Sequence, residues 1–413
     1  MTDERVTWRD RGFPDGDVPL TEVGAQGWRL LDGDFVLPIV ALRATALERN
    51  LALMEGYCRR HDVLVAPHAK TTMSPALVAR QIAAGAWGVT VANVQQARVF
   101  ITAGVRRVLV ANPVVGAADL GYLAACRRAD PGLEVILLVD SVEGVALLAD
   151  RAVPDPADQR PLAVLLELGY DGGRGGARTT EEAVRVAEAV RATAGLELVG
   201  VEGFEGLVPG ADDAERRGRA ADFLAWSAEV VHRLVEDGLL PARGVVVSFG
   251  GSSYFDLVVD RFRARWTGER VEVLLRSGCY LTHDHGLYAR TSPFVGEEPP
   301  PLPALEVWAE VLSRPEPGLA ILGAGRRDVS TDADLPLPVA VRHRGRTRPA
   351  GGLRVTAVND QHAMLAVPDD VALEVGDLVC LGVSHPCTTF DKWRLLPVVS
   401  DEYEVTDAVR TYF

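Results

Sequence analysis

The chain of 413 residues carries 57 acidic and 43 basic side chains, which gives a formal net charge of −14 at pH 7. This acidity excludes nucleic acid and anionic membranes as main partners, because phosphate groups and lipid headgroups would repel the protein. The five cysteines are scattered, and the sequence shows neither an N-terminal signal core nor an apolar stretch of about 18 residues. We therefore expect a cytoplasmic protein without a disulfide framework.

From residue 63 onward, short apolar segments alternate with segments of helical periodicity. We expect strands at 63–70, 88–92, 105–112, 134–140, 161–168, 196–206, 244–251 and 271–280. Helices are expected at 75–84, 93–103, 116–129, 142–149, 180–193, 211–237 and 254–262. Apolar strands separated by helices predict a parallel sheet covered on both faces, and eight such units predict an α/β fold of the TIM type, a (β/α)8 barrel. A doubly wound open sheet is the alternative.

A change of composition near residue 290 marks the expected end of the barrel. The chain passes through the Pro-rich segment SPFVGEEPPPLP into short alternating segments between Gly, Pro and Asp turns, a pattern typical of antiparallel strands. We therefore expect the barrel at 35–290 and a C-terminal antiparallel β domain at 291–413. Residues 1–34 are polar and rich in turns, and we expect this N-terminal segment to join the β domain.

Lysine occurs only at Lys70 and Lys392, so arginine supplies nearly all of the basic side chains. A primary amine can lose its proton and form a Schiff base with a carbonyl, as in pyridoxal phosphate enzymes, whereas a guanidinium cannot. Lys70 ends the predicted strand at 63–70, and catalytic groups of (β/α)8 barrels lie at the C-terminal ends of strands. Lys392 follows Asp391, which indicates an exposed ion pair. Lys70 is therefore the candidate cofactor lysine.

Other chemically unusual residues also fall at the ends of predicted strands. They are Arg174 in GYDGGRGG, Glu205 in EGFEG, the SFGGSS turn and the RSGCY segment. Gly250, Gly251 and Ser252 offer small side chains, backbone N–H groups and a hydroxyl, which suit close approach to a phosphate. Gly278 follows the eighth strand, where barrels commonly complete a phosphate site. The same turn could also be an ordinary loop.

A pair of metal-ligand residues stands near the C-terminus in VSHPCTTFDKW. His385 and Cys387 project to the same side if the segment is extended, and an imidazole with a thiolate favours zinc. Two ligands suit a catalytic rather than a structural zinc, although a third protein ligand would be usual. A buried cysteine beside a capping histidine is the alternative. We interpret His283, Asp284 and His285 as a turn at a strand end rather than a second metal site.

These motifs resemble the D-serine dehydratase and D-threonine aldolase family of alanine-racemase-like, fold-type III pyridoxal phosphate enzymes. The resemblance covers residues 35–400 and includes PHAKTT, DGGRGG, GGSS, SGCY and HPC. It implies pyridoxal phosphate in the barrel, zinc in the β domain and a homodimer. The cofactor-binding residues that it implies are His68, Lys70, Arg174, Gly250, Gly251, Ser252, Gly278, Cys279 and Tyr280. The metal ligands are His385 and Cys387, and the substrate neighbours are Thr72, Tyr170 and His362.

The function that we expect is β-elimination of a D-β-hydroxy amino acid, such as D-serine or D-threonine, to a keto acid and ammonia. Lys70 would be the catalytic base, and the zinc would coordinate the leaving hydroxyl. Retro-aldol cleavage to glycine and an aldehyde is an alternative, and so is racemisation. A pyridoxal phosphate homeostasis protein is the non-enzyme alternative. An unrelated barrel enzyme that uses Glu167 and Glu205 as an acid/base pair would bind no such cofactor.

Overall fold

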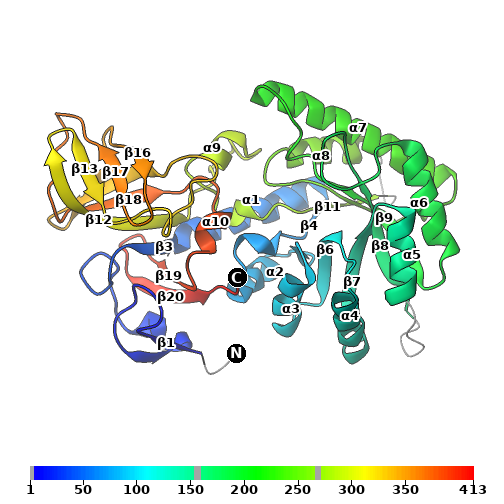
Figure 1. Ribbon diagram of the computed structural model, residues 1–413, viewed down its shortest axis with the longest axis horizontal. Helices are drawn as coiled ribbons and strands as arrows, with labels where there is room; N and C mark the ends of the chain where they lie inside the picture. Colours follow the sequence, from blue (N-terminus) through cyan, green and yellow to red (C-terminus); the bar gives the residue numbers. More distant parts are fainter. Residues whose placement is uncertain (1–3, 153–159, 266–270) are drawn as a thin grey trace. The chain divides into compact units, whose positions relative to one another are not determined.

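The computed structural model describes residues 4–152, 160–265 and 271–413 (Figure 1). Its contacts divide the chain into two compact units. The barrel unit contains residues 55–70 and 78–278. The sheet unit contains residues 71–77, the described residues up to Met54, and all residues from Cys279 onward. The expected domain boundaries at 35 and 290 stay a prediction.

Eight parallel strands form the barrel unit, and from β5 to β11 each strand pairs with the next one along the chain. They are β4 (Leu64–Val65), β5 (Val89–Val91), β6 (Arg107–Pro113), β7 (Glu134–Val139), β8 (Leu162–Leu168), β9 (Leu196–Gly203), β10 (Val245–Ser248) and β11 (Val271–Leu275). The last strand, β11, pairs with β4. The ring closes beyond β4, because His68 bridges to Thr90 and the Trp87 amide donates to the Val65 carbonyl at 2.8 Å. The predicted barrel is confirmed.

The helices of the predicted alternation follow these strands. They are α2 (Pro75–Ala83), α3 (Val94–Thr102), α4 (Ala117–Ala129), α5 (Val142–Arg151), α6 (Thr180–Ala192), α7 (Asp213–Glu236) and α8 (Phe255–Arg265). Figure 1 shows α3 to α8 outside the strands. The starts of four helices are fixed by side chains that accept a backbone N–H of the first turn, namely Asn93, Ser141, Thr179 and Asp212.

The inside of the barrel is filled by apolar side chains, so it is not a channel. Ala66, Leu109, Ile136, Leu138, Leu165 and Leu274 form one buried cluster. Burial of each large aliphatic side chain contributes about 1.5–3 kcal/mol. This core leaves the ends of the strands as the place where polar side chains can gather.

The sheet unit is built on ten strands with mainly antiparallel pairing, as predicted for the C-terminal region. They are β3 (Ile39–Arg43), β12 (Leu305–Glu316), β13 (Leu319–Leu322), β14 (Leu337–His343), β15 (Arg346–Pro349), β16 (Arg354–Val358), β17 (Ala363–Ala366), β18 (Leu378–Gly382), β19 (Leu395–Val399) and β20 (Val405–Arg410). Strand β3 precedes the barrel in sequence, yet it pairs with β12 and β19. It leads into α1 (Ala44–His61).

The N-terminal segment packs in the sheet unit. It contains β1 (Arg5–Thr7), β2 (Asp17–Pro19) and the 3-10 turn η1 (Leu20–Ala25). Arg410 of β20 forms ion pairs at 2.9 Å with both Glu4 and Asp10. The remaining short elements are η2 (Ala69–Thr71), η3 (Cys279–Leu281), α9 (Leu287–Thr291) and α10 (Cys387–Phe390). None of the helices in the described parts of the chain has the length and apolar composition that a bilayer crossing requires.

Candidate active site

The two lysines have different surroundings. Lys70 lies in η2, five residues after the barrel strand β4 ends at Val65, and is exposed. Lys392 lies after α10, and its Nζ is 3.4 Å from the Asp391 carboxylate, which confirms the predicted ion pair. Lys70 is thus the lysine that the barrel presents at a strand end.

The imidazole of His68 is held neutral beside Lys70. Its Nδ1 atom is buried and has no hydrogen-bond partner within the described residues. Burial, followed by the positive charges of Lys70, Arg276 and Arg174, lowers the pKa of His68 well below its ordinary value. A neutral imidazole with an unused buried nitrogen can accept or donate a hydrogen bond to a molecule bound at this end of the barrel.

Two carboxyl groups and an arginine form a buried polar cluster at the ends of β8, β9 and β11. Arg276 Nη2 lies 2.8 Å from Glu202 Oε2, and the two side chains are only 8% and 2% exposed. Burial raises the pKa of Glu167 to about 8, and the charges of Glu202 and Asp140 act in the same direction. Glu167 is therefore mostly protonated at pH 7 and can donate a proton.

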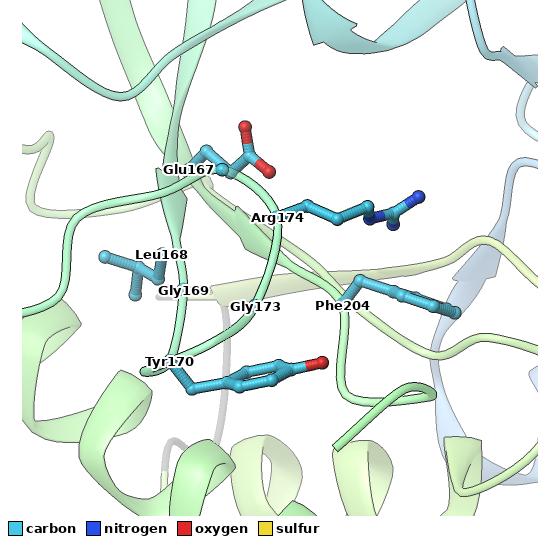
Figure 2. A pocket seen from close by; sticks show the side chains of 8 residues that line it. Glu167, Leu168, Gly169, Tyr170, Gly173, Arg174 and Phe204 are labelled. Atoms are coloured by element: carbon cyan, nitrogen blue, oxygen red, sulfur yellow. The ribbon is translucent and has the colours of Figure 1, made fainter. Parts of the chain in front are cut away.

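A pocket lies where β8 and β9 end, and Figure 2 shows its lining. The Arg174 guanidinium sits over the Phe204 ring, 5.2 Å from the ring centroid, which is a favourable cation–π contact. Tyr170 lines the pocket with them and packs edge-on against Phe223 at 5.4 Å. A cation held over an aromatic ring in a pocket suits an anionic group such as a carboxylate or a phosphate.

The glycine-rich loop that carries Arg174 is braced by Arg178, a residue that the sequence reasoning missed. The Arg178 guanidinium donates to the backbone carbonyls of Gly173 and Arg174 at 2.9 Å and of Gly176 at 2.8 Å. It also donates to the carbonyl of Gly175. The planar guanidinium of this single side chain thus donates to four carbonyls of the loop, a geometry that a lysine cannot reproduce.

The amides of the Gly250–Gly251 turn face a buried carboxylate. Both amides donate to the buried Glu205 carboxylate, at 3.2 Å for Gly250 and 2.9 Å for Gly251. A Cβ at either position would approach a neighbouring side chain to 2.7 Å, Leu275 for Gly250 and Phe204 for Gly251. Glu205 therefore caps this turn. The role of the two glycines toward phosphate stays a prediction.

In the sheet unit, three potential metal ligands come together. Atoms of Cys279, His385 and Cys387 lie within 4.8 Å of one another. The Sγ atoms of Cys279 and Cys387 are 3.6 Å apart. The hydroxyl of Thr71 is 3.7 Å from Cys279 Sγ and 3.4 Å from Cys387 Sγ. The predicted His385 and Cys387 pair is thus joined by a second cysteine, which the sequence reasoning had assigned only to the cofactor.

The histidine of this cluster is oriented by two aspartates. Its Nδ1 lies 2.6 Å from Asp332 Oδ2, so this nitrogen carries the proton and Nε2 is left to bind a metal. Its backbone N–H donates to Asp284 at 2.8 Å and holds His385 at a positive φ of 63°. Asp284 also accepts the Gly286 and Tyr288 amides. Asp284 therefore holds the backbone of this segment in place, which agrees with the interpretation of 283–285 as a turn.

The thiol of Cys279 is unusually acidic for a buried cysteine. Hydrogen bonding with Cys387, aided by Tyr288, His385 and Thr71, lowers the pKa of Cys279 to about 6, although burial acts in the opposite direction. By contrast, burial alone raises the pKa of Cys58 to about 12. The thiolate is the form that binds metals.

The other predicted residues occupy varied positions. Thr72 is buried, and its hydroxyl accepts the Ser74 amide at 3.4 Å. Tyr280 is buried in η3, Gly278 is buried before it, and Ser252 is half-buried after β10. His362 is exposed in the turn between β16 and β17. Their predicted roles toward cofactor or substrate remain predictions.

Comparisons with known proteins agree with this geometry. The chain belongs to the alanine racemase family, because residues 42–255 match the model of the alanine racemase N-terminal domain. Residues 304–399 match the putative serine dehydratase domain. Together these matches confirm the recognised family, the alanine-racemase-like D-serine dehydratase and D-threonine aldolase group.

Individual relatives cover nearly the whole chain. A D-threonine aldolase of Arthrobacter sp is 28% identical over 88% of this chain and 89% of its own length. A 3-hydroxy-D-aspartate aldolase of Paracoccus denitrificans is 28% identical over 86% of each chain. A D-threo-3-hydroxyaspartate dehydratase of Delftia sp. is 26% identical over 85% of this chain and 91% of its own. The solved D-threonine aldolase from Filomicrobium marinum is 27% identical, with a TM-score of 0.75 over 92% of this chain and 95% of its own.

The described residues fit the groups that this family implies. An amine at Lys70, an unpartnered buried nitrogen on His68 and the pocket cation Arg174 suit an aldehyde-bearing, anionic cofactor such as pyridoxal phosphate. Two sulfur atoms and an imidazole nitrogen suit zinc.

Proposed function

We propose that this protein is a lyase that uses pyridoxal phosphate and zinc to eliminate the β-hydroxyl group of a D-β-hydroxy amino acid, giving a keto acid and ammonia. Family membership supports the cofactor. The names of the relatives support a D-configured substrate with a β-hydroxyl, and the name of one of them is that of a dehydratase.

The residues of the barrel unit have defined tasks in this proposal. Pyridoxal phosphate, when bound, withdraws electrons from the amino acid and makes its α-proton acidic. Lys70 would hold the cofactor and, once released, take up the α-proton on Nζ. Arg174 would bind an anionic group at the pocket.

The cluster of Cys279, His385 and Cys387 is the observation that carries elimination, because a metal held there can assist the loss of the β-hydroxyl group. His385 and Cys387 would hold zinc, a Lewis acid that withdraws charge from a leaving hydroxyl. Retro-aldol cleavage instead needs a base for the hydroxyl proton. His385 would not be this base, because its Nδ1 is committed to Asp332 and its Nε2 would be bound to the metal, so retro-aldol cleavage would need another residue.

Retro-aldol cleavage is the second candidate, since three of the relatives described above have the names of aldolases. The homodimer and the cytoplasmic location that the sequence predicts belong to the same proposal. Size-exclusion chromatography with light scattering tests the dimer.

The experiment is a product assay on purified protein loaded with pyridoxal phosphate and zinc. D-serine, D-threonine and β-hydroxy-D-aspartate are tested with their L-isomers, and keto acid, ammonia, glycine and aldehyde are all measured. Elimination predicts keto acid and ammonia in equal amounts, lost in Lys70→Ala and after chelation but retained in Lys392→Ala. Glycine with aldehyde would replace the proposal by retro-aldol cleavage. A cofactor-loaded protein with no product would favour the homeostasis protein.

A further inference from the structure

We propose that Cys279 is a third protein ligand of the zinc ion, so that the site is Cys2His with one open position for the substrate hydroxyl. The inference rests on the proposed function, which supplies the zinc ion and its role at the substrate hydroxyl. It adds Cys279 as the ligand that makes the site selective for zinc. His385 and Cys387 alone would leave most positions of a zinc ion to water.

The distances fit a tetrahedral zinc site. With Zn–S bonds of about 2.3 Å, two sulfur ligands of one tetrahedral ion lie about 3.8 Å apart. The Sγ atoms of Cys279 and Cys387 are 3.6 Å apart, and the imidazole of His385 is within the same 4.8 Å cluster. A disulfide would instead require the two sulfur atoms at about 2.05 Å. The side chains are therefore already close to the positions that a shared ion needs.

The surroundings hold each donor in place. Cys279 is buried at the start of η3, and Cys387 begins α10 directly after Pro386, whose fixed φ suits the entry to a helix. Asp332 bonds His385 Nδ1 at 2.6 Å and accepts the Thr388 hydroxyl at 2.8 Å. A carboxylate behind a ligating imidazole is the usual support of a zinc histidine, because it fixes the tautomer and the ring orientation.

The second thiolate has a chemical consequence. Zn²⁺ with two thiolates and a neutral imidazole has no net charge, whereas one thiolate leaves a charge of +1. Soft sulfur ligands select zinc and cobalt over manganese and magnesium, which prefer oxygen. Cys279 therefore makes the site selective for zinc. A carboxylate at this position would favour manganese.

Zinc K-edge X-ray absorption of the zinc-loaded holoenzyme tests the inference without relying on activity. The expected spectrum has two sulfur scatterers at about 2.3 Å in the wild type and one in Cys279→Ser. Retention of zinc against a chelator is expected to fall at least about tenfold in Cys279→Ser. Cys126→Ser, a half-buried cysteine of α4, is the matched control and is expected to behave like the wild type.

Two further measurements keep the outcomes distinct. Cys279→Asp is expected to raise the manganese-to-zinc ratio after loading from an equal mixture, which a role limited to packing would not produce. Alkylation of the denatured protein is expected to count five thiols, and a count of three would indicate a disulfide and overturn the inference. One sulfur scatterer in the wild type would also overturn it. Two scatterers in a protein that forms no product would leave Cys279 as a ligand and refute the proposed function alone.

Discussion

Breaking the buried ion pair between Arg276 and Glu202 is expected to lower the free energy of unfolding of the barrel strongly. Replacing Arg276 with Met keeps the apolar volume but leaves the Glu202 carboxylate without its partner 2.8 Å away, in a site where it is 2% exposed. Breaking such a pair costs about 3–5 kcal/mol. The loss includes the hydrogen bond from Arg276 to the Gly203 carbonyl, which is worth about 1.5–3 kcal/mol for a charged donor.

Removing both charges is expected to restore most of this stability. A buried pair replaced by apolar side chains of similar volume is often neutral or stabilising, so Glu202→Met with Arg276→Met should recover at least about 2 kcal/mol relative to Arg276→Met. The pKa of Glu202 is raised by burial, and Arg276 acts against this shift. The loss in Arg276→Met is therefore expected to shrink at pH 5, where the carboxyl can take up a proton.

Urea denaturation at pH 5 and pH 7 of the wild type, both single variants and the double variant measures these free energies of unfolding. The matched control is Arg233→Met, which breaks an exposed pair with Asp237 at 2.6 Å and should cost far less, because water screens exposed ion pairs. If Arg276→Met costs no more than this control, or if the double variant is as unstable as the sum of the single ones, the buried pair is not coupled as described.

Two other predictions concern Glu167 and the metal histidine. Burial raises the pKa of Glu167 from 4.5 to about 8. The free energy of unfolding of the wild type therefore falls as the pH rises between these two values, because the unfolded state loses this proton more readily, whereas Glu167→Gln has no such proton. The melting temperature of Glu167→Gln minus that of the wild type should therefore increase from pH 5 to pH 8. Parallel pH curves for the two proteins would contradict the raised pKa of Glu167. Asp332→Asn should lower zinc retention about 10–100-fold, because His385 loses the carboxylate that orients it. Chelator competition measures zinc retention. The control is Asp334→Asn, because Asp334 accepts a hydrogen bond from Ser384 and not from His385. Equal zinc retention in both variants would show that Asp332 does not support the metal.

The barrel could be predicted because its signals are local. Each strand is a short apolar run, and side chains such as Thr179 with Glu182 mark the helix starts within three residues of sequence. The pairing of β3 with β12 could not be predicted in this way. These strands are more than two hundred and fifty residues apart in the sequence, and an apolar run does not specify a distant partner.

The candidate site shows the same limit. Lys70, His385 and Cys387 could be found because their chemistry is rare or their spacing is short. Cys279 lies 108 residues before Cys387, so only the fold reveals that their thiols meet. The amides of Gly250 and Gly251 donate to the Glu205 carboxylate, a contact that the sequence did not predict. Which acceptor an amide faces depends on tertiary packing, which a glycine-rich motif does not encode.

The assignment of pyridoxal phosphate to Lys70 can be tested directly, because Lys392 is the only other lysine of the sequence. The holoenzyme is reduced with borohydride, digested and mapped by mass spectrometry. We predict a phosphopyridoxyl group on Lys70, with Lys392 unmodified and with no labelled peptide from Lys70→Ala. Modification of Lys392, or no modified lysine in cofactor-saturated protein, would contradict the account.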